Sequence, residues 1–158
     1  MILYNELVLK SPFLGSRRVK GRPREIVRYT DNKPGLIPEV WHEAFRLAAS
    51  DLGVQYFQDA LILPQSFNAS AFEEYTRTFS KVNKERFEAI PKGAKIWFDV
   101  HLFENKMSPN TYAKLLSIVG KQYGMSHWGN KFGYGRFDVA LIKRKKVDVQ
   151  LDLDLLQL

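Results

Sequence analysis

The chain has 158 residues, no cysteine and a formal net charge of +7 at pH 7. This length suits one domain with a sizeable core, and the lack of cysteine excludes a disulfide framework and thiolate metal sites. No apolar stretch approaches the ~18 residues of a membrane span, so we expect a cytoplasmic protein, and its positive charge favours a polyanionic partner.

The first third of the chain predicts a strand, a basic loop and a helix. Residues 2–9 (ILYNELVL) alternate loosely between apolar and polar positions, which is typical of a strand. Residues 15–25 are too polar to join a core and predict a loop, and residues 26–29 predict a short strand. The stretch from Pro38 to Gly53 predicts a helix, because its apolar residues recur at helical spacing and proline suits a first helical turn.

The rest of the chain predicts further strands around a second helix. Residues 54–63 predict a strand, and residues 69–90 predict a mixture of strand and helix, because their aromatic residues fit a helical face only in part. Residues 95–103 predict a strand, residues 109–123 a helix, and residues 135–142 the last strand. This order predicts an α+β fold of the ferredoxin-like (split βαβ) type, an antiparallel sheet with helices on one face.

Positive charge is concentrated in the loop after the first strand. Between Lys10 and Arg28 there are seven basic residues and a single acid, Glu25. Ion pairing with so few acids cannot explain them, which favours contacts with phosphates. The candidate residues are Arg17, Arg18, Lys20, Arg22 and Arg24. A solvated basic loop without a partner is the alternative.

A glycine-rich loop precedes the last predicted strand, in the run SHWGNKFGYGRFDVALI at 126–142. Glycine costs conformational entropy on folding, so the cluster needs a positive φ or a close approach of a ligand to the backbone. Aromatic side chains can stack on unpaired bases, and basic ones can pair with phosphates. The aromatic candidates are Trp128, Phe132 and Tyr134, and the basic ones are Lys131 and Arg136. Alternatively, Trp128 and Phe137 are core residues and the glycines only form a tight connection; for Phe137 we favour the core.

The second half of the chain, with this loop and the sequence GYGRF at the start of the last strand, resembles the RAMP superfamily of CRISPR-associated RNA-binding proteins. The residues that match the motif are Gly129, Gly133, Gly135, Arg136 and Phe137. The segments SPFLGSRR and LIPEVWHEAFRLAA are also similar to the family, so the resemblance spans most of residues 1–142. It implies a ferredoxin-like fold and RNA bound along the glycine loop, where backbone N–H groups reach phosphates.

Some RAMP proteins cleave RNA without a metal, with a histidine as general acid or base. By this resemblance the candidate catalytic residues are His42, in the first helix, and His127, beside the glycine loop. Since Trp41 precedes His42, a hydrogen-bonded histidine packed in the fold is the alternative. No Walker loop, carboxylate pair or zinc-ligand spacing occurs, and Asp99 with Asp138 on adjacent predicted strands is a weak metal site. We therefore expect no metal and no cofactor, and favour a binding protein over an enzyme.

The chain ends in an acidic, apolar tail after the basic run KRKK at 143–146. Residues 150–155 (QLDLDL) resemble the hexapeptide by which bacterial replication and repair proteins dock on the DNA sliding clamp. The matching residues are Gln150, Leu151, Leu153 and Leu155. Alternating leucines would fill an apolar groove while the aspartates stay in water. An edge strand, and self-association by addition of the tail to a neighbour's sheet, are the alternatives.

These patterns predict a ferredoxin-like nucleic-acid-binding domain at 1–142, followed by a basic hinge and an acidic-apolar tail at 143–158. The leading hypothesis is a protein of phage or mobile-element character that binds RNA or single-stranded or structured DNA, and docks a protein partner through its tail. The alternatives are a metal-independent endoribonuclease and an inhibitor whose basic face binds an acidic protein surface. RNA or DNA, sequence specificity and oligomeric state stay open.

Overall fold

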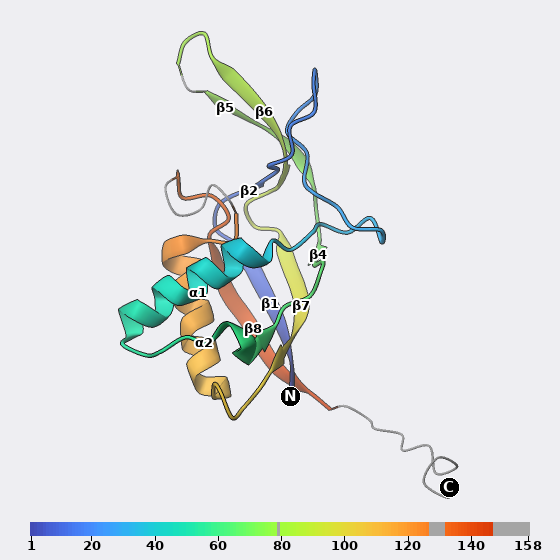
Figure 1. Ribbon diagram of the computed structural model, residues 1–158. Coiled ribbons are helices and arrows are strands. Elements are labelled where there is room, and N and C mark those ends of the chain that lie inside the picture. Colours follow the sequence, from blue (N-terminus) through green and yellow to red (C-terminus); the bar gives the residue numbers. More distant parts are fainter. Residues whose placement is uncertain (79, 127–131, 147–158) are drawn as a thin grey trace, which may run out of the picture.

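The protein has an α+β structure, in which the described residues form two antiparallel sheets and two α-helices (Figure 1). The computed structural model describes residues 1–78, 80–126 and 132–146. The larger sheet and the helices form the body, and the smaller sheet projects from one end of it. The elements are β1 (Ile2–Leu9), β2 (Phe13–Leu14), α1 (Pro38–Leu52), the 3-10 turn η1 (Gln58–Ala60), β3 (Leu61–Ile62), β4 (Asn68–Ala69), β5 (Glu73–Thr78), β6 (Lys84–Ile90), β7 (Lys95–Leu102), α2 (Pro109–Ile118), the π-helical turn η2 (Val119–Tyr123) and β8 (Phe137–Lys145).

In the larger sheet the strands follow the order β3, β7, β1 and β8, and β4 pairs with another part of β7. β1 is antiparallel to both of its neighbours, with Leu3 opposite Val100 of β7 and Arg144 of β8. β7 and β8 therefore run parallel on either side of β1, and α2 is the crossover between them. In the same way, α1 leads from β1 to β3, which lies on the far side of β7.

Both helices begin at the residues that the sequence predicts, and α1 also ends as predicted, whereas α2 ends at Ile118 and the π-helical turn η2 covers the rest of the predicted range 109–123. Pro38 occupies the first turn of α1, and Gly53 ends the helix in the left-handed conformation with φ 75°. At the start of α2 the Ser108 side chain accepts a hydrogen bond of 3.1 Å from the Thr111 N–H. No helix within the described ranges has the length and apolar character that crossing a membrane requires.

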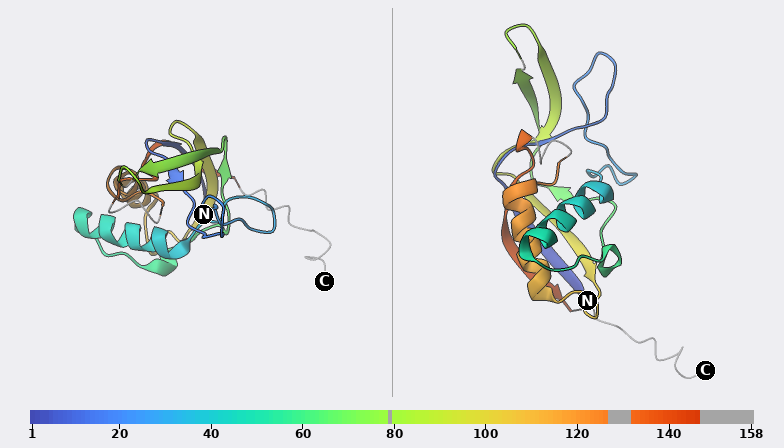
Figure 2. Two further views of the ribbon diagram at one scale, coloured as in Figure 1. Left: turned by 90° about the horizontal axis from the view of Figure 1, so that it is seen from above. Right: turned by 60° about the vertical axis from the view of Figure 1, so that its left-hand side comes forward.

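The core lies between the two helices and one face of the larger sheet, and both helices lie on that face (Figure 2). The Trp41 ring of α1 is 5.4 Å from Phe98 of β7 and 6.1 Å from Phe137 of β8, measured between ring centroids. Asn5 of β1 is buried there, and its side chain donates to two backbone carbonyls and accepts a 2.7 Å hydrogen bond from the Tyr112 hydroxyl. Phe137 is only 1% exposed, so the prediction that it is a core residue is confirmed.

The smaller sheet consists of β2, β6 and β5, and its long part is the β5–β6 hairpin. Residues 69–90 thus contain no helix in their described part, so the prediction of a helical portion is wrong. The aromatic residues at these positions pack across strands instead of along a helix: Tyr75 of β5 lies directly opposite Phe87 of β6. Alternation with period two explains why a helical face fitted them only in part.

Two other predicted strands are absent or shortened in the described chain. Residues 26–29 form no strand, because the Ile26 N–H donates to the Glu88 side chain at 2.9 Å and has no strand neighbour. Of residues 54–63, only the last two belong to a strand, β3. The Tyr56 ring stacks on Phe45 of α1 with 5.8 Å between centroids, which holds the preceding residues against the helix.

Candidate nucleic-acid interface

A basic groove lies between the loop at 18–24 and the tip of the β5–β6 hairpin, which stand side by side at the top of Figure 1. The groove has a volume of about 810 Å³ and is open to solvent. Its lining contains six cations and a single carboxylate, that of Glu85. The cations are Arg18, Lys20, Arg22 and Arg24 from the loop, and Lys84 and Arg86 from β6. Two segments far apart in the sequence therefore build one positively charged surface.

Backbone hydrogen bonds hold the base of the loop in place. Arg17 and Glu25 exchange N–H···O bonds of 3.0 and 2.9 Å, and the Arg24 N–H donates to the Arg86 carbonyl at 2.9 Å. Gly15 packs so closely on this base that a Cβ would lie 2.5 Å from the carbonyl carbon of Glu25. The loop thus combines a fixed base on β6 with an exposed basic tip.

Two of the five predicted loop residues have carboxylate partners. Arg24 pairs with Glu85 of β6, and its guanidinium lies 5.9 Å from the centroid of the Phe87 ring. Arg22 lies 3.8 Å from Glu25 in a largely exposed pair, which contributes little. The expectation that ion pairing cannot explain these cations is therefore wrong for Arg24, because folding brings a glutamate from β6 to it.

The remaining groove cations differ from Arg24. In the described part of the chain, Arg18, Lys20 and Lys84 form no ion pair, and all three are exposed. Arg17, outside the groove lining, is exposed as well. Arg86 makes a loose, exposed contact of 3.5 Å with Glu74. The groove therefore keeps several cations whose charge no described carboxylate offsets.

The two described glycines of the glycine loop serve different purposes. Gly135 has φ 71°, is buried, and donates its N–H to the Pro12 carbonyl at 2.7 Å. A Cβ on Gly135 would lie 2.7 Å from that of Ser126, so a tight connection requires glycine here. Gly133 has φ 75°, and nothing described lies within 4 Å of the place where its Cβ would be. Of these two, Gly133 is the position open to a ligand.

Arg136 is fastened to the body and does not point freely into solvent. Its backbone N–H donates to the Ser11 hydroxyl at 2.9 Å, and its guanidinium donates to the Lys121 carbonyl at 2.6 Å. The same Ser11 hydroxyl donates to the Gly133 carbonyl at 2.6 Å. Arg136 thus ties the glycine loop to η2, the turn that follows α2, and one of its guanidinium N–H groups is already used.

A row of side chains joins the glycine loop to the basic loop across one face of the smaller sheet. Tyr134 packs edge-on against Tyr75 of β5, with 5.7 Å between ring centroids and 3.3 Å between hydroxyls. Both tyrosines pack against the cluster that contains Phe87 of β6. The Arg24 guanidinium lies over the same Phe87 ring, 5.9 Å from its centroid. Two of the predicted site residues, Tyr134 and Arg24, thus share one face.

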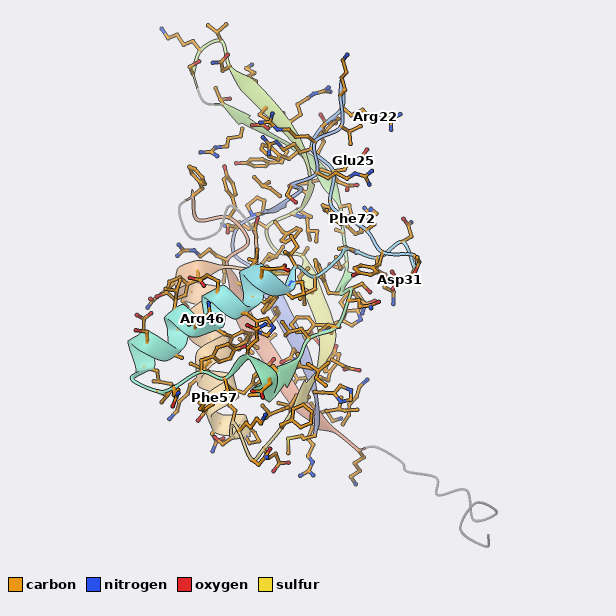
Figure 3. The ribbon with its side chains drawn as sticks, in the orientation of Figure 1. Arg22, Glu25, Asp31, Arg46, Phe57 and Phe72 are labelled. Atoms are coloured by element: carbon orange, nitrogen blue, oxygen red, sulfur yellow. The ribbon has the colours of Figure 1, made fainter. Side chains whose placement is uncertain are left out.

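The surface beside the groove is rich in carboxylates. A second, smaller pocket of about 390 Å³ lies there, and Arg22, Glu25 and Phe72, which line it, are close together in Figure 3. Its carboxylates are Glu25, Glu73, Glu74 and Glu88. Arg22 lines this pocket as well as the groove, and Glu25, Glu74 and Glu88 each have an arginine partner. The carboxylates are therefore partly neutralised, and what remains of their charge makes this pocket less favourable for a polyanion than the groove.

His42 lies apart from the groove lining. Its Nδ1 is 2.7 Å from the Tyr56 hydroxyl, and the two rings lie 6.1 Å apart. Burial, with Arg46 as the second cause, lowers the pKa of His42, so the imidazole is neutral at pH 7. These contacts are those of the packed, hydrogen-bonded histidine that the sequence left as the alternative.

No family model and no curated protein matches the chain. Several predicted residues lie outside the described residues: His127, Trp128, Gly129 and Lys131 in the glycine loop, and Gln150, Leu151, Leu153 and Leu155 in the tail. Docking of the tail on a sliding clamp stays a prediction.

The weak metal site considered for Asp99 and Asp138 rests on a wrong assumption about the sheet. Their strands are not adjacent, because β1 lies between β7 and β8. Each carboxylate also has a lysine partner: Lys145 is 2.6 Å from Asp99, and Lys10 is 3.0 Å from Asp138. Within the described residues, no group of three or more histidine or acidic side chains is placed to hold a metal ion.

Sequence reasoning missed the contribution of the hairpin. Lys84 and Arg86 form the second wall of the groove, and Tyr75 and Arg77 lie under the glycine loop. The available signal was the run KVNKERF at 81–87, in which cations surround a turn. Recognising this run as the turn of a β-hairpin would have predicted a second basic segment, the one that forms the other wall of the groove.

Proposed function

We propose that the groove between the 18–24 loop and the hairpin tip binds nucleic acid. The observation that carries the proposal is the charge of its two walls, which supply six cations against one carboxylate. Cations spread over both walls suit a ligand with negative charges repeated along its length. A single small anion would reach only a few of them. The carboxylates of the neighbouring pocket favour a bound strand confined to the groove.

The order of strands and helices supports the further proposal that the body is ferredoxin-like and related to the RAMP superfamily. Four strands in the order β3, β7, β1 and β8, with α1 and α2 as crossovers, are what a split βαβ repeat requires. The β5–β6 hairpin is an addition to that plan. The glycine loop precedes β8, as it does in the family pattern stated for the sequence.

A salt titration tests the proposed function. For a single strand, the logarithm of the association constant falls by about 0.7 per neutralised phosphate for each unit of log salt concentration. If all six groove cations contact phosphates, we expect a slope of about −4 for single-stranded RNA, measured by fluorescence anisotropy. Absence of binding, or a slope near zero, would contradict the proposal.

Two other outcomes would favour the alternative functions. RNA cleavage by the purified protein, lost in His42→Ala or His127→Ala with binding retained, would favour a metal-independent endoribonuclease. Binding to an acidic protein that RNA does not displace would favour an inhibitor. His42 is not part of the groove lining and contacts the Tyr56 hydroxyl, which supports the binding function over cleavage by this residue.

We also propose, from its sequence, that the tail at 147–158 docks a protein partner such as the bacterial sliding clamp. The double variant Leu153→Ala/Leu155→Ala is expected to abolish capture of purified clamp by the full chain, because the two leucines are the apolar anchors of the motif. Asp152→Asn/Asp154→Asn is the matched control, since the aspartates stay in water. Equal capture by the leucine variant and the parent would refute the docking.

A further inference from the structure

An arginine is stacked against aromatic rings where the glycine loop meets the hairpin. The Arg77 guanidinium of β5 lies 4.3 Å from the centroid of the Phe132 ring and 5.7 Å from that of Tyr134. Phe132 nevertheless remains 47% exposed. Burial, followed by the Tyr75 hydrogen bond, raises the pKa of Tyr134, which keeps its hydroxyl neutral. The result is a half-exposed phenyl ring backed by a guanidinium, beside the tyrosines that pack with the Phe87 cluster.

The same pairing occurs a second time, in surroundings richer in carboxylates. Arg28 lies 4.6 Å from the centroid of Phe72, which is 43% exposed. This pair lies beside the acidic pocket, because Arg28 is bound to Glu88 at 3.0 Å and Phe72 lines the pocket. The carboxylates disfavour a phosphate strand there, whereas the Phe132 pair adjoins Tyr134, which packs with the cluster of Phe87, the ring that Arg24 contacts. Only the Phe132 pair is suited to a nucleobase.

We infer that Phe132, backed by Arg77, is a stacking platform for an unpaired base, so that the groove takes single-stranded in preference to duplex nucleic acid. The inference rests on the proposed function and names its substrate class. Bases within a duplex are already stacked on one another and offer no face to a protein ring. A base in a single strand is free to leave its neighbours and stack on an aromatic side chain.

A continuous chain of side-chain contacts leads from the groove to the Phe132 platform. Arg24 lines the groove and covers Phe87, Phe87 packs with Tyr75 and Tyr134, and Tyr134 adjoins Arg77. A strand whose phosphates lie in the groove can therefore continue along this face toward the glycine loop. Its bases reach the platform as the backbone follows the cations.

The test compares three probes of equal length: a single-stranded RNA of mixed sequence, the same strand annealed to its complement, and an oligomer of abasic ribose phosphates. The variant is Phe132→Leu, which keeps an apolar cover over Arg77 but removes the ring. We expect affinity for the single strand to fall roughly 5- to 150-fold, as for loss of one stacked base. Affinity for the abasic oligomer is expected to stay unchanged, because it has no base to stack.

Two further variants control for structure. Phe132→Tyr keeps an aromatic face and is expected to retain the parent affinity. Phe72→Leu removes the matched ring beside the carboxylate-rich pocket, and it is expected to leave the affinity for the single strand unchanged. If the parent binds all three probes equally and Phe132→Leu changes nothing, the platform is refuted while the groove stands. If the parent binds none of the probes, the proposed function itself fails.

Discussion

The triple variant Arg18→Ala/Lys20→Ala/Lys84→Ala is expected to bind single-stranded RNA roughly 100- to 1000-fold more weakly than the parent. These cations come from both walls of the groove, and within the described residues none has a carboxylate partner, so their charge is available to phosphates. Loss of three phosphate contacts should also make the salt slope shallower by about 2. Anisotropy titrations at several salt concentrations measure both quantities.

The control for this variant removes the same charge elsewhere. Lys92, Lys114 and Lys143 are exposed and lie outside the groove lining, in the turn before β7, on α2 and on β8. Their triple alanine variant is expected to lower affinity only slightly, through the general field of the protein. If both triple variants lowered the RNA affinity equally, net charge alone would attract RNA, and the groove would not be the binding site.

The parts of the fold that the sequence predicts well are those with local signals. Pro38 and Gly53 predict the two ends of α1, because each favours its helix-end position through its own backbone conformation and needs no distant partner. β1 and β7 alternate between buried and more exposed residues over eight positions each. This alternation can be recognised in the sequence of each strand without knowing its neighbours in the sheet. Such elements also place the glycine loop correctly, before β8.

The hairpin and the groove are harder to predict because their determinants are distant in sequence. Arg24 looked unpaired, and its partner Glu85 reaches it only because the loop aligns with β6 through the Arg24 N–H and the Arg86 carbonyl. Likewise, the Glu88 side chain takes the Ile26 N–H that a strand would have used. Spacing along one segment carries no information on such cross-chain contacts.

The glycines show why a sequence pattern alone does not decide whether a glycine serves tight packing or access for a ligand. Gly133 and Gly135 both have positive φ, yet only Gly135 is enclosed by neighbouring backbone and side chain. The same residue type therefore serves packing at one position and access at another, two residues away. A sequence records the conformational freedom but not the direction in which the missing Cβ would point.

Trp41→Ala is expected to lower the free energy of unfolding by about 3–5 kcal/mol, the range for removal of a buried large aromatic side chain. Trp41 is 1% exposed and contacts rings from three elements, Phe45 of α1, Phe98 of β7 and Phe137 of β8. Loss of this ring leaves a cavity where α1 meets the sheet. In urea unfolding, the midpoint should fall with little change in slope.

This loss should act on stability and leave the groove intact, since Trp41 is not part of its lining. Domains of this size are stable by roughly 5–15 kcal/mol, so enough folded protein remains in the cold to measure RNA affinity. That affinity, corrected for the unfolded fraction, is expected to equal the parent's. Arg46→Ala, which removes an exposed partner of Glu43 on the same helix, should change stability by about 0.5 kcal/mol or less. If both variants lowered the free energy of unfolding by a similar amount, α1 would stabilise the protein no more through its buried Trp41 than through its surface. That result would contradict the role given to the aromatic core.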